Sequence, residues 1–129
     1  MPKKVIATDR APAAVGAYSQ ATVAGGWVFC SGQIGLDPGT GALVEGGVVP
    51  EAKQIMKNLG AVLEAAGGSF DDVVKCSIFL ADMGDFGAVN EVYAAAFAGM
   101  EPPARACVAV ESLPKHVQVE VEAIAYLGP

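Results

Sequence analysis

Up to residue 49 the chain consists of short apolar runs interrupted by turn-forming residues. Glycine-rich clusters at Ala24–Gly26 and Asp37–Gly41 punctuate these runs. Clusters of glycine, proline and aspartate end strands and form tight connections. We therefore expect short strands within residues 3–9, 17–34 and 42–49.

A helix is predicted from Pro50 to Ala66, because apolar residues recur there at spacings of three and four. Pro50 and Glu51 suit the first turn of a helix, and Gly67 and Gly68 mark its end. The apolar face of this helix consists of Ala52, Ile55, Met56, Leu59, Val62, Leu63 and Ala66.

A second helix is predicted after Asp82, which can serve as its N-cap, with Asp85 three residues later and Gly99 at its end. Asn90 falls on the apolar face of this helix, where an amide must find hydrogen-bond partners. A structural bond to a loop carbonyl and a role in a binding pocket are equally open for it. The apolar residues of this face are Phe86, Val89, Tyr93, Ala96 and Phe97.

Three further strands are predicted by their β-branched and aromatic residues, within 72–82, 104–111 and 117–127. Strands, helix, strand, helix and two strands in this order indicate an α+β sheet with both helices on one face. The other face also carries apolar side chains, so we expect copies of the chain to bury it. The 129 residues correspond to one domain, residues 1–129.

Side chains in the last two strands alternate between two faces. Arg105, Cys107 and Ala109 share one face of their strand. If the two strands form a hairpin centred near Leu113–Pro114, Cys107 lies opposite Glu120 and Arg105 lies opposite Glu122. This register would bring the arginine, the thiol and the carboxylates together.

Arg105 is a charged residue in a run that is otherwise small and apolar, so it requires an anionic partner. One candidate is an internal carboxylate, Glu120 or Glu122, in an ordinary cross-strand ion pair. The other candidate is the carboxylate of a small ligand, which the planar guanidinium can bind through two parallel hydrogen bonds.

Tyr18 and the pair Ser31–Gly32 are weaker candidates for a site. Tyr18 precedes a predicted strand and could direct its hydroxyl into a cleft, although buried structural tyrosines are commoner. Ser31 and Gly32 stand at a strand end, where backbone N–H groups are expected to be free.

Composition excludes several classes of function. Hydrophobic residues make up 53% of the chain and charged residues 17%, with no apolar run long enough to span a membrane. A net charge of −6 opposes binding to nucleic acid. The three cysteines are widely spaced and His116 is the one histidine, so we expect reduced thiols and no metal site. The N-terminus lacks the apolar segment of a secretory signal, which makes the cytoplasm the expected compartment.

Five blocks of the sequence together resemble one protein family, the RidA-like reactive-intermediate deaminases, also called the YjgF family. The resemblance covers nearly the whole chain. It implies a chorismate-mutase-like α+β fold, a homotrimer with helices outside a central barrel, and active sites between subunits. It also implies hydrolysis of 2-imino acids, formed from 2-aminoacrylate and related enamines, to 2-keto acids and ammonia without a cofactor. The blocks are "APAAVGAYSQA", "CSGQIGLDPGTG", "EAKQIMKNLGAVLEAAG", "PPARACVAVESLPK" and "VEVEAIA".

The resemblance also implies roles for individual residues. The family's carboxylate-binding arginine falls on Arg105, its adjacent cysteine on Cys107 and its water-handling glutamate on Glu120. Cys107 could also be a nucleophile, but the sequence offers no nearby histidine, so packing and a backbone contact are favoured. The other pocket positions fall on Tyr18, Ser31, Gly32 and Asn90.

The sequence departs from the family pattern at two places. Pro102–Pro103 stands where many members have Phe-Pro, which changes the apolar wall of the pocket, and His116 replaces a commonly acidic or small residue. Three other functions remain open for a chain of this fold. They are a ribonuclease or translation inhibitor, a chaperone-like protein, and a carboxylate-binding protein without turnover.

Overall fold

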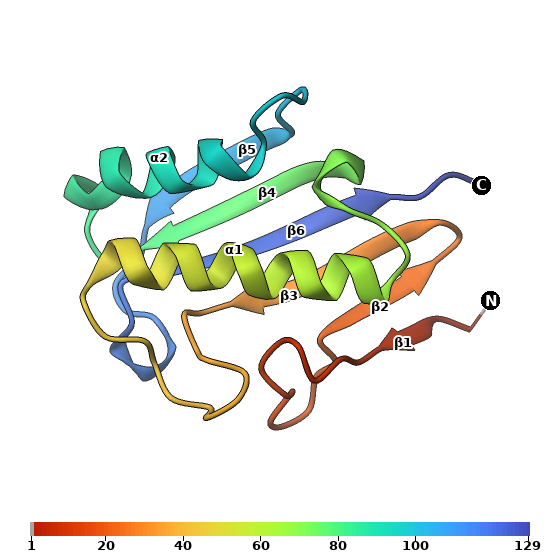
Figure 1. Ribbon diagram of the computed structural model, residues 1–129, viewed down its shortest axis with the longest axis horizontal. Helices are drawn as coiled ribbons and strands as arrows, with labels where there is room; N and C mark the ends of the chain where they lie inside the picture. The colour runs from red at the N-terminus through yellow and green to blue at the C-terminus, as the bar shows by residue number, and fades with distance from the viewer. Residues whose placement is uncertain (1) are drawn as a thin grey trace.

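A computed structural model describes residues 2–129 and contains one mixed sheet with two helices on one of its faces (Figure 1). The six strands lie in the order β1-β2-β3-β6-β4-β5, which confirms the predicted α+β architecture. Neither helix combines the length and the apolar character that crossing a bilayer requires. The elements are β1 (Lys4–Ile6), β2 (Ala21–Ala24), β3 (Trp27–Gln33), α1 (Val48–Ala65), β4 (Val73–Leu80), α2 (Phe86–Ala96), β5 (Ala104–Ala109) and β6 (Val119–Tyr126).

The core lies between the sheet and α1 and α2. On β6 the predicted alternation is confirmed, because every second residue from Val119 to Ala125 is buried beneath the helices. The intervening side chains, from Glu120 to Tyr126, point to the opposite face and are half-buried or exposed. Helix α1 packs against β6 and β3, and α2 packs against α1.

Helix α1 is confirmed but begins at Val48, two residues before the predicted start. Its end is a Schellman motif, in which the Gly67 N–H donates to the Glu64 carbonyl and the Gly68 N–H donates to the Leu63 carbonyl. Gly67 has a φ of +92°, a conformation that residues with a Cβ rarely adopt. The glycine pair therefore ends the helix for the reason the sequence indicated.

The strand predicted within residues 42–49 was wrong. The structure forms only an isolated antiparallel bridge between Leu36 and Leu43 in this region. Gly46 and Gly47 have φ values of +112° and +98°, which interrupt an extended strand. Val48, although β-branched, becomes the first residue of α1.

The second predicted helix is confirmed as α2, with a short 3₁₀ turn before it. The Asp82 side chain accepts a hydrogen bond of 2.8 Å from the Gly84 N–H, so it caps the turn Met83–Asp85 rather than α2 itself. α2 then runs from Phe86 to Ala96. Gly99, with a φ of +79°, lies in the turn that follows.

The predicted hairpin between the last two strands was wrong. β5 pairs in parallel with β4, so Arg105 lies beside Cys76 and Cys107 beside Ile78. Helix α2 supplies the crossover that parallel pairing requires. After the turn Pro114–His116 the chain returns as β6, which inserts between β3 and β4. β4 therefore separates the two strands that the hairpin would have paired.

The face of the sheet opposite the helices is apolar and uncovered in the single chain, as the sequence indicated. Phe29 and Val108 are 46% and 47% exposed, and Trp27 packs on Tyr126 with a ring separation of 4.5 Å. Exposed aromatic side chains gathered on one sheet face are typical of an interaction surface. We call this surface the open face.

Candidate active site

Arg105 lies on the helix-bearing side of edge strand β5, in a cradle made by α2. Its Nη1 donates a hydrogen bond of 2.6 Å to the Asn90 side-chain oxygen. Its guanidinium carbon lies 5.3 Å from the ring centre of Phe86 and 5.1 Å from that of Tyr93. Cation–π contacts of this length hold the side chain in place without neutralising its charge.

The guanidinium retains most of its hydrogen-bonding capacity. Of its five N–H donors, one is used by Asn90, and among residues 2–129 Arg105 forms no salt bridge. The internal ion pair with Glu120 or Glu122, one of the two alternatives drawn from the sequence, is therefore absent from the described chain. Of the two roles open for Asn90, the bond to a loop carbonyl is not found among residues 2–129, and its half-buried side chain instead accepts a hydrogen bond from Arg105.

Cys107 follows Arg105 on the same face and is half-buried. Burial raises the pKa of its thiol, and the positive charge of Arg105 offsets this in part. Burial likewise raises the pKa of Cys30 to about 12 and raises that of Cys76. All three thiols are therefore protonated at neutral pH, and a thiol is a far weaker nucleophile than a thiolate.

Glu120 lies in the middle of the sheet on the open face, where its carboxylate rests against the backbone of β3. A Cβ at residue 32 would overlap this carboxylate, so the approach requires Gly32. Burial, and to a smaller degree the charge of Glu122, raise the pKa of Glu120. A carboxyl group with a raised pKa is better suited to accept and return protons near neutral pH.

Ser31 and Gly32 lie at an interruption of the β3–β6 ladder, whose register shifts between Cys30 and Gln33. The Ser31 hydroxyl donates a hydrogen bond of 2.6 Å to the Ser19 carbonyl. The backbone N–H of Ser31 donates to the Gln20 carbonyl at 3.0 Å, so the expectation that this N–H is free was wrong. Ser31 instead ties the segment before β2 to the strand that carries Gly32.

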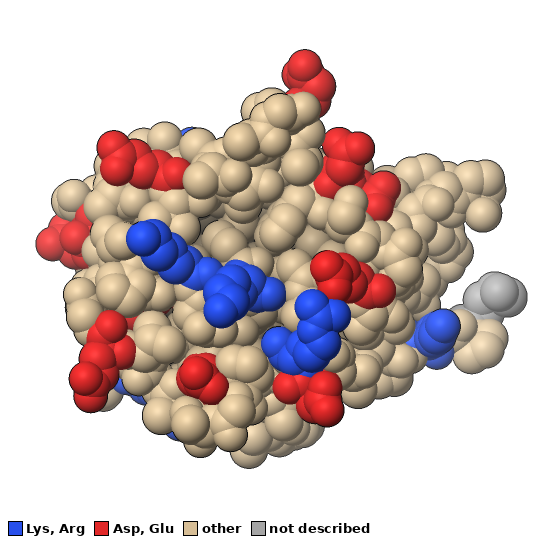
Figure 2. Space-filling model, viewed as in Figure 1, with Lys and Arg blue, Asp and Glu red and all other residues tan. Residues whose placement is uncertain are grey.

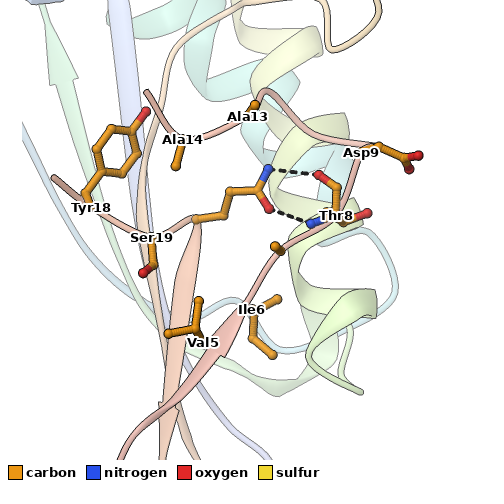
Figure 3. Close-up of a pocket in the computed structure, with 10 residues that line it drawn as sticks. Val5, Ile6, Thr8, Asp9, Ala13, Ala14, Tyr18 and Ser19 are labelled. Carbon is orange, nitrogen blue, oxygen red and sulfur yellow. Dashed lines mark hydrogen bonds between the residues drawn. The ribbon is translucent and has the colours of Figure 1, made fainter. Parts of the chain in front are cut away.

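Tyr18 is 53% exposed at the edge of a cavity of about 540 Å³, opposite Thr8 (Figure 3). The loop between β1 and Tyr18 is held by the buried amide of Gln20. This amide accepts from the Thr8 N–H at 2.7 Å and donates to the Thr8 and Pro12 carbonyls at 2.9 and 2.8 Å. The tyrosine is therefore presented to the surface rather than packed in the core.

The predicted site residues form two clusters rather than one. Arg105, Asn90 and Cys107 make the first, which we call the arginine cluster. Glu120, Gly32 and Ser31 make the second, which we call the glutamate cluster. Tyr18 belongs to neither cluster, because it lines the separate cavity described above and is linked to Ser31 only through the neighbouring Ser19 carbonyl.

The two clusters lie on opposite faces of the sheet. Glu120 pairs with Phe79 of β4 and Cys107 pairs with Ile78. Phe79 and Ile78 are consecutive residues of one strand, so their side chains point in opposite directions. A single substrate cannot touch both clusters of one chain.

Sequence reasoning did not assign Phe86, Tyr93 and Gln20 to the site. Phe86 and Tyr93 were predicted only as part of the apolar face of α2. An aromatic residue that contacts a cation and one that packs in the core recur at the same helical spacing, so the sequence does not distinguish them. Gln20 follows Tyr18 and Ser19 in a segment without a regular apolar period, so the sequence pattern did not indicate that it is buried. Its burial is visible only in the tertiary structure.

The chain is similar to known proteins over nearly its whole length. The family model described as Endoribonuclease L-PSP matches residues 8–127. The 2-iminobutanoate/2-iminopropanoate deaminase of Mus musculus is 56% identical over 98% of this chain and 93% of its own length. The protein of the same name from Homo sapiens is 50% identical over 98% of this chain and 92% of its own length.

Solved structures show the same fold. A member of the Rid protein family from Yersinia pestis superposes with a TM-score of 0.95 at 44% identity, covering 97% of this chain and 99% of that one. E. coli TdcF, with bound serine, has a TM-score of 0.92 at 42% identity, with coverage of 97% and 99%. Because one family model spans nearly all of the described fold and these relatives share about half of its residues, the chain belongs to the Endoribonuclease L-PSP family, that of the YjgF and RidA proteins.

Proposed function

We propose that this protein is a hydrolytic deaminase of 2-imino acids, which it converts to 2-keto acids and ammonia. Mammalian relatives about half identical to it over nearly their full length carry the name of a 2-iminobutanoate/2-iminopropanoate deaminase. In the reaction, the oxygen of water bonds to the imine carbon, and the carbon–nitrogen bond of the resulting tetrahedral adduct breaks. One water is consumed and one ammonia is released.

In this mechanism Arg105 binds the substrate's carboxylate. Its free N–H donors form a planar fork that fits two carboxylate oxygens, and Asn90, Phe86 and Tyr93 fix the fork in one orientation. An imine carbon is already electrophilic, so holding it beside a positioned water supplies much of the catalysis. The step as proposed uses only water and side chains of the protein.

Glu120 acts as the general base and then as the general acid. Its carboxylate accepts a proton from the attacking water and gives it to the imine nitrogen, which forms the tetrahedral adduct. When the carbon–nitrogen bond breaks, the proton of the adduct's hydroxyl passes through the same carboxylate to the nitrogen, which departs as ammonia. The raised pKa of Glu120 supports this role, because the group that takes the proton must also release it. Cys107, whose thiol is protonated, contributes packing and backbone position beside Arg105.

The observation that carries the proposal is the separation of the two clusters on opposite faces of one chain. A complete site then needs the arginine cluster of one copy and the glutamate cluster of another. We propose a homotrimer in which the apolar open face forms the central barrel and the helices lie outside. Burial of Phe29 and Val108 would stabilise such an assembly.

The family description names ribonuclease activity, which makes RNA cleavage the second candidate. The charge of −6 disfavours an RNA site. Figure 2 shows basic side chains in a band across the helix-bearing face with acidic groups around it. Arg10, Lys53 and Lys57 border the groove between the helices there, and Arg10 is already paired with Glu64 at 2.8 Å.

We also place the protein in the cytoplasm, since its three cysteines are unpaired.

The test is an assay of ammonia and keto acid, with imines generated in situ from several amino acids. We expect release of both products by the wild type and loss of turnover in Arg105→Ala. Binding of the keto acid without ammonia release would favour a carboxylate-binding protein. RNA cleavage that survives Arg105→Ala, with no imine turnover, would favour the ribonuclease, and suppression of client aggregation alone would favour a chaperone.

A further inference from the structure

Helix α1 carries two buried polar side chains that the proposed mechanism does not use. Glu51, in the first turn, is 2% exposed, and Asn58, two turns later, is fully buried. The helix lies across β3 and β6, the strands that carry Gly32 and Glu120 (Figure 1). Buried polar groups are as a rule hydrogen-bonded, so their partners show which segments these two side chains hold in place.

Glu51 holds the chain where it enters β6. Its Oε1 accepts a hydrogen bond of 3.0 Å from the backbone N–H of Gln118, two residues before Glu120. The carbonyl of Gln118 accepts a hydrogen bond of 3.1 Å from the N–H of Ala81, the residue after β4. Both backbone groups of Gln118 are therefore fixed, one by α1 and one by the end of β4.

The loop that follows β3 is held on the same turn of α1. Gly35 is buried against this turn, because a Cβ at residue 35 would lie 2.9 Å from the Cα of Glu51. One residue further, the Leu36 carbonyl accepts a hydrogen bond of 3.0 Å from the Asn58 amide. The loop begins directly after the strand segment that contains Gly32. Helix α1 therefore fixes the chain on both sides of the glutamate cluster.

We infer that Glu51 is a positioning residue for Glu120, which holds the general base against the backbone of Gly32. The inference rests on the proposed function, in which Glu120 transfers the protons. Glu51 lies on the helix side of the sheet and Glu120 on the open face, so Glu51 acts through the backbone and not on the substrate. Two segments meet at the contact between Gly32 and Glu120, and both rest on Glu51.

Substitutions of Glu51 separate this role from a role in binding. Glu51→Ala removes the acceptor of the Gln118 N–H, whereas Glu51→Gln keeps an oxygen that can accept it. Displacement of a catalytic group by about 1 Å can cost roughly 100-fold in rate. We expect Glu51→Ala to lower kcat for 2-iminopropanoate by about tenfold to a hundredfold, and Glu51→Gln to retain most of the wild-type kcat. The inhibition constant of the 2-keto acid product should stay unchanged in both, because its carboxylate binds Arg105.

Leu59 provides a control for a general loss of stability. It is fully buried on the same helix, and its apolar side chain forms no hydrogen bond. Leu59→Ala should lower the melting temperature at least as much as Glu51→Ala and still retain most of kcat. Equal losses of kcat in these two variants would overturn the inference. A Glu51→Gln variant as slow as Glu51→Ala would overturn it as well.

A pair of glycine variants tests the same contact without removing the carboxylate. Gly35→Ala would push the loop after β3 away from Glu51, whereas a Cβ at Gly87, on the exposed side of α2, would meet no atom within 4 Å. Gly35→Ala should lower kcat about tenfold or more with an unchanged inhibition constant, and Gly87→Ala should leave both unchanged. Equal kcat in the two glycine variants would refute the inference. Absence of turnover by the wild type with every imine would instead overturn the proposed function itself.

Discussion

Two inactive variants should restore activity to each other if the site is shared between chains. Arg105→Lys removes the planar fork but leaves the glutamate cluster intact, because the two clusters lie on opposite faces. Glu120→Gln removes the base and leaves the arginine cluster intact. Each variant alone has a defect in every site, whereas a mixed assembly contains sites in which both halves are wild type.

The size of the effect follows from this geometry. Arg105 is exposed in the single chain, but in the proposed site between two chains its pair with the substrate carboxylate is desolvated. Loss of one partner of such a pair costs about 2–5 kcal/mol, so Arg105→Lys should lower kcat/KM by tens- to thousands-fold. Glu120→Gln should lower kcat by about 10²–10⁴ while substrate still binds. In assemblies formed from equal amounts of the two variants, half of the interfaces receive an intact arginine and half of those receive an intact glutamate. About a quarter of the sites should therefore have wild-type activity.

The assay mixes the variants under conditions in which chains exchange, followed by mass spectrometry to verify mixed assemblies, and then measures ammonia release. The double variant Arg105→Lys/Glu120→Gln, mixed with either single variant, is the control, because no interface then has both halves intact. Mixed assemblies no more active than the better single variant would refute the shared site. Full stability of Arg105→Ala together with normal turnover would show that the arginine has no part in catalysis.

Three further outcomes are expected. In the proposed mechanism the carboxylate of Glu120 is the active form, and its pKa is raised, so kcat/KM should fall as the pH decreases at values above the usual carboxyl range. Glu122→Gln removes one cause of the raised pKa, so this fall should move to lower pH, and an unmoved profile would contradict the role of Glu120. Cys107→Ala should keep substantial activity in a folded assembly, whereas complete loss would indicate a covalent mechanism. Phe29→Asp should convert the proposed trimer to monomers in light scattering and abolish turnover, and a wild-type monomer at micromolar concentration would exclude the trimer.

The sequence by itself determined which side of each element faces the core. In β6 the strict alternation from Val119 to Ala125 can be buried on one face only, and in α1 the spacing from Ala52 to Leu63 allows one apolar stripe. The five sequence blocks also determined the family, which the comparisons confirm. These properties depend on residues close together in the chain, and so local patterns report them.

Only the tertiary structure decided which elements are neighbours. Nothing in the alternation of the last two strands distinguishes a hairpin from an insertion of β6 between β3 and β4, because both bury the same side chains. That choice moved Glu120 away from Arg105 and onto the opposite face. Likewise, the start of α1 at Val48 depended on Gly46 and Gly47 adopting positive φ, which their sequence permits but does not require. Which side of an element is buried follows from the local spacing of its apolar residues. The order of the strands follows instead from how the whole sheet buries its apolar area.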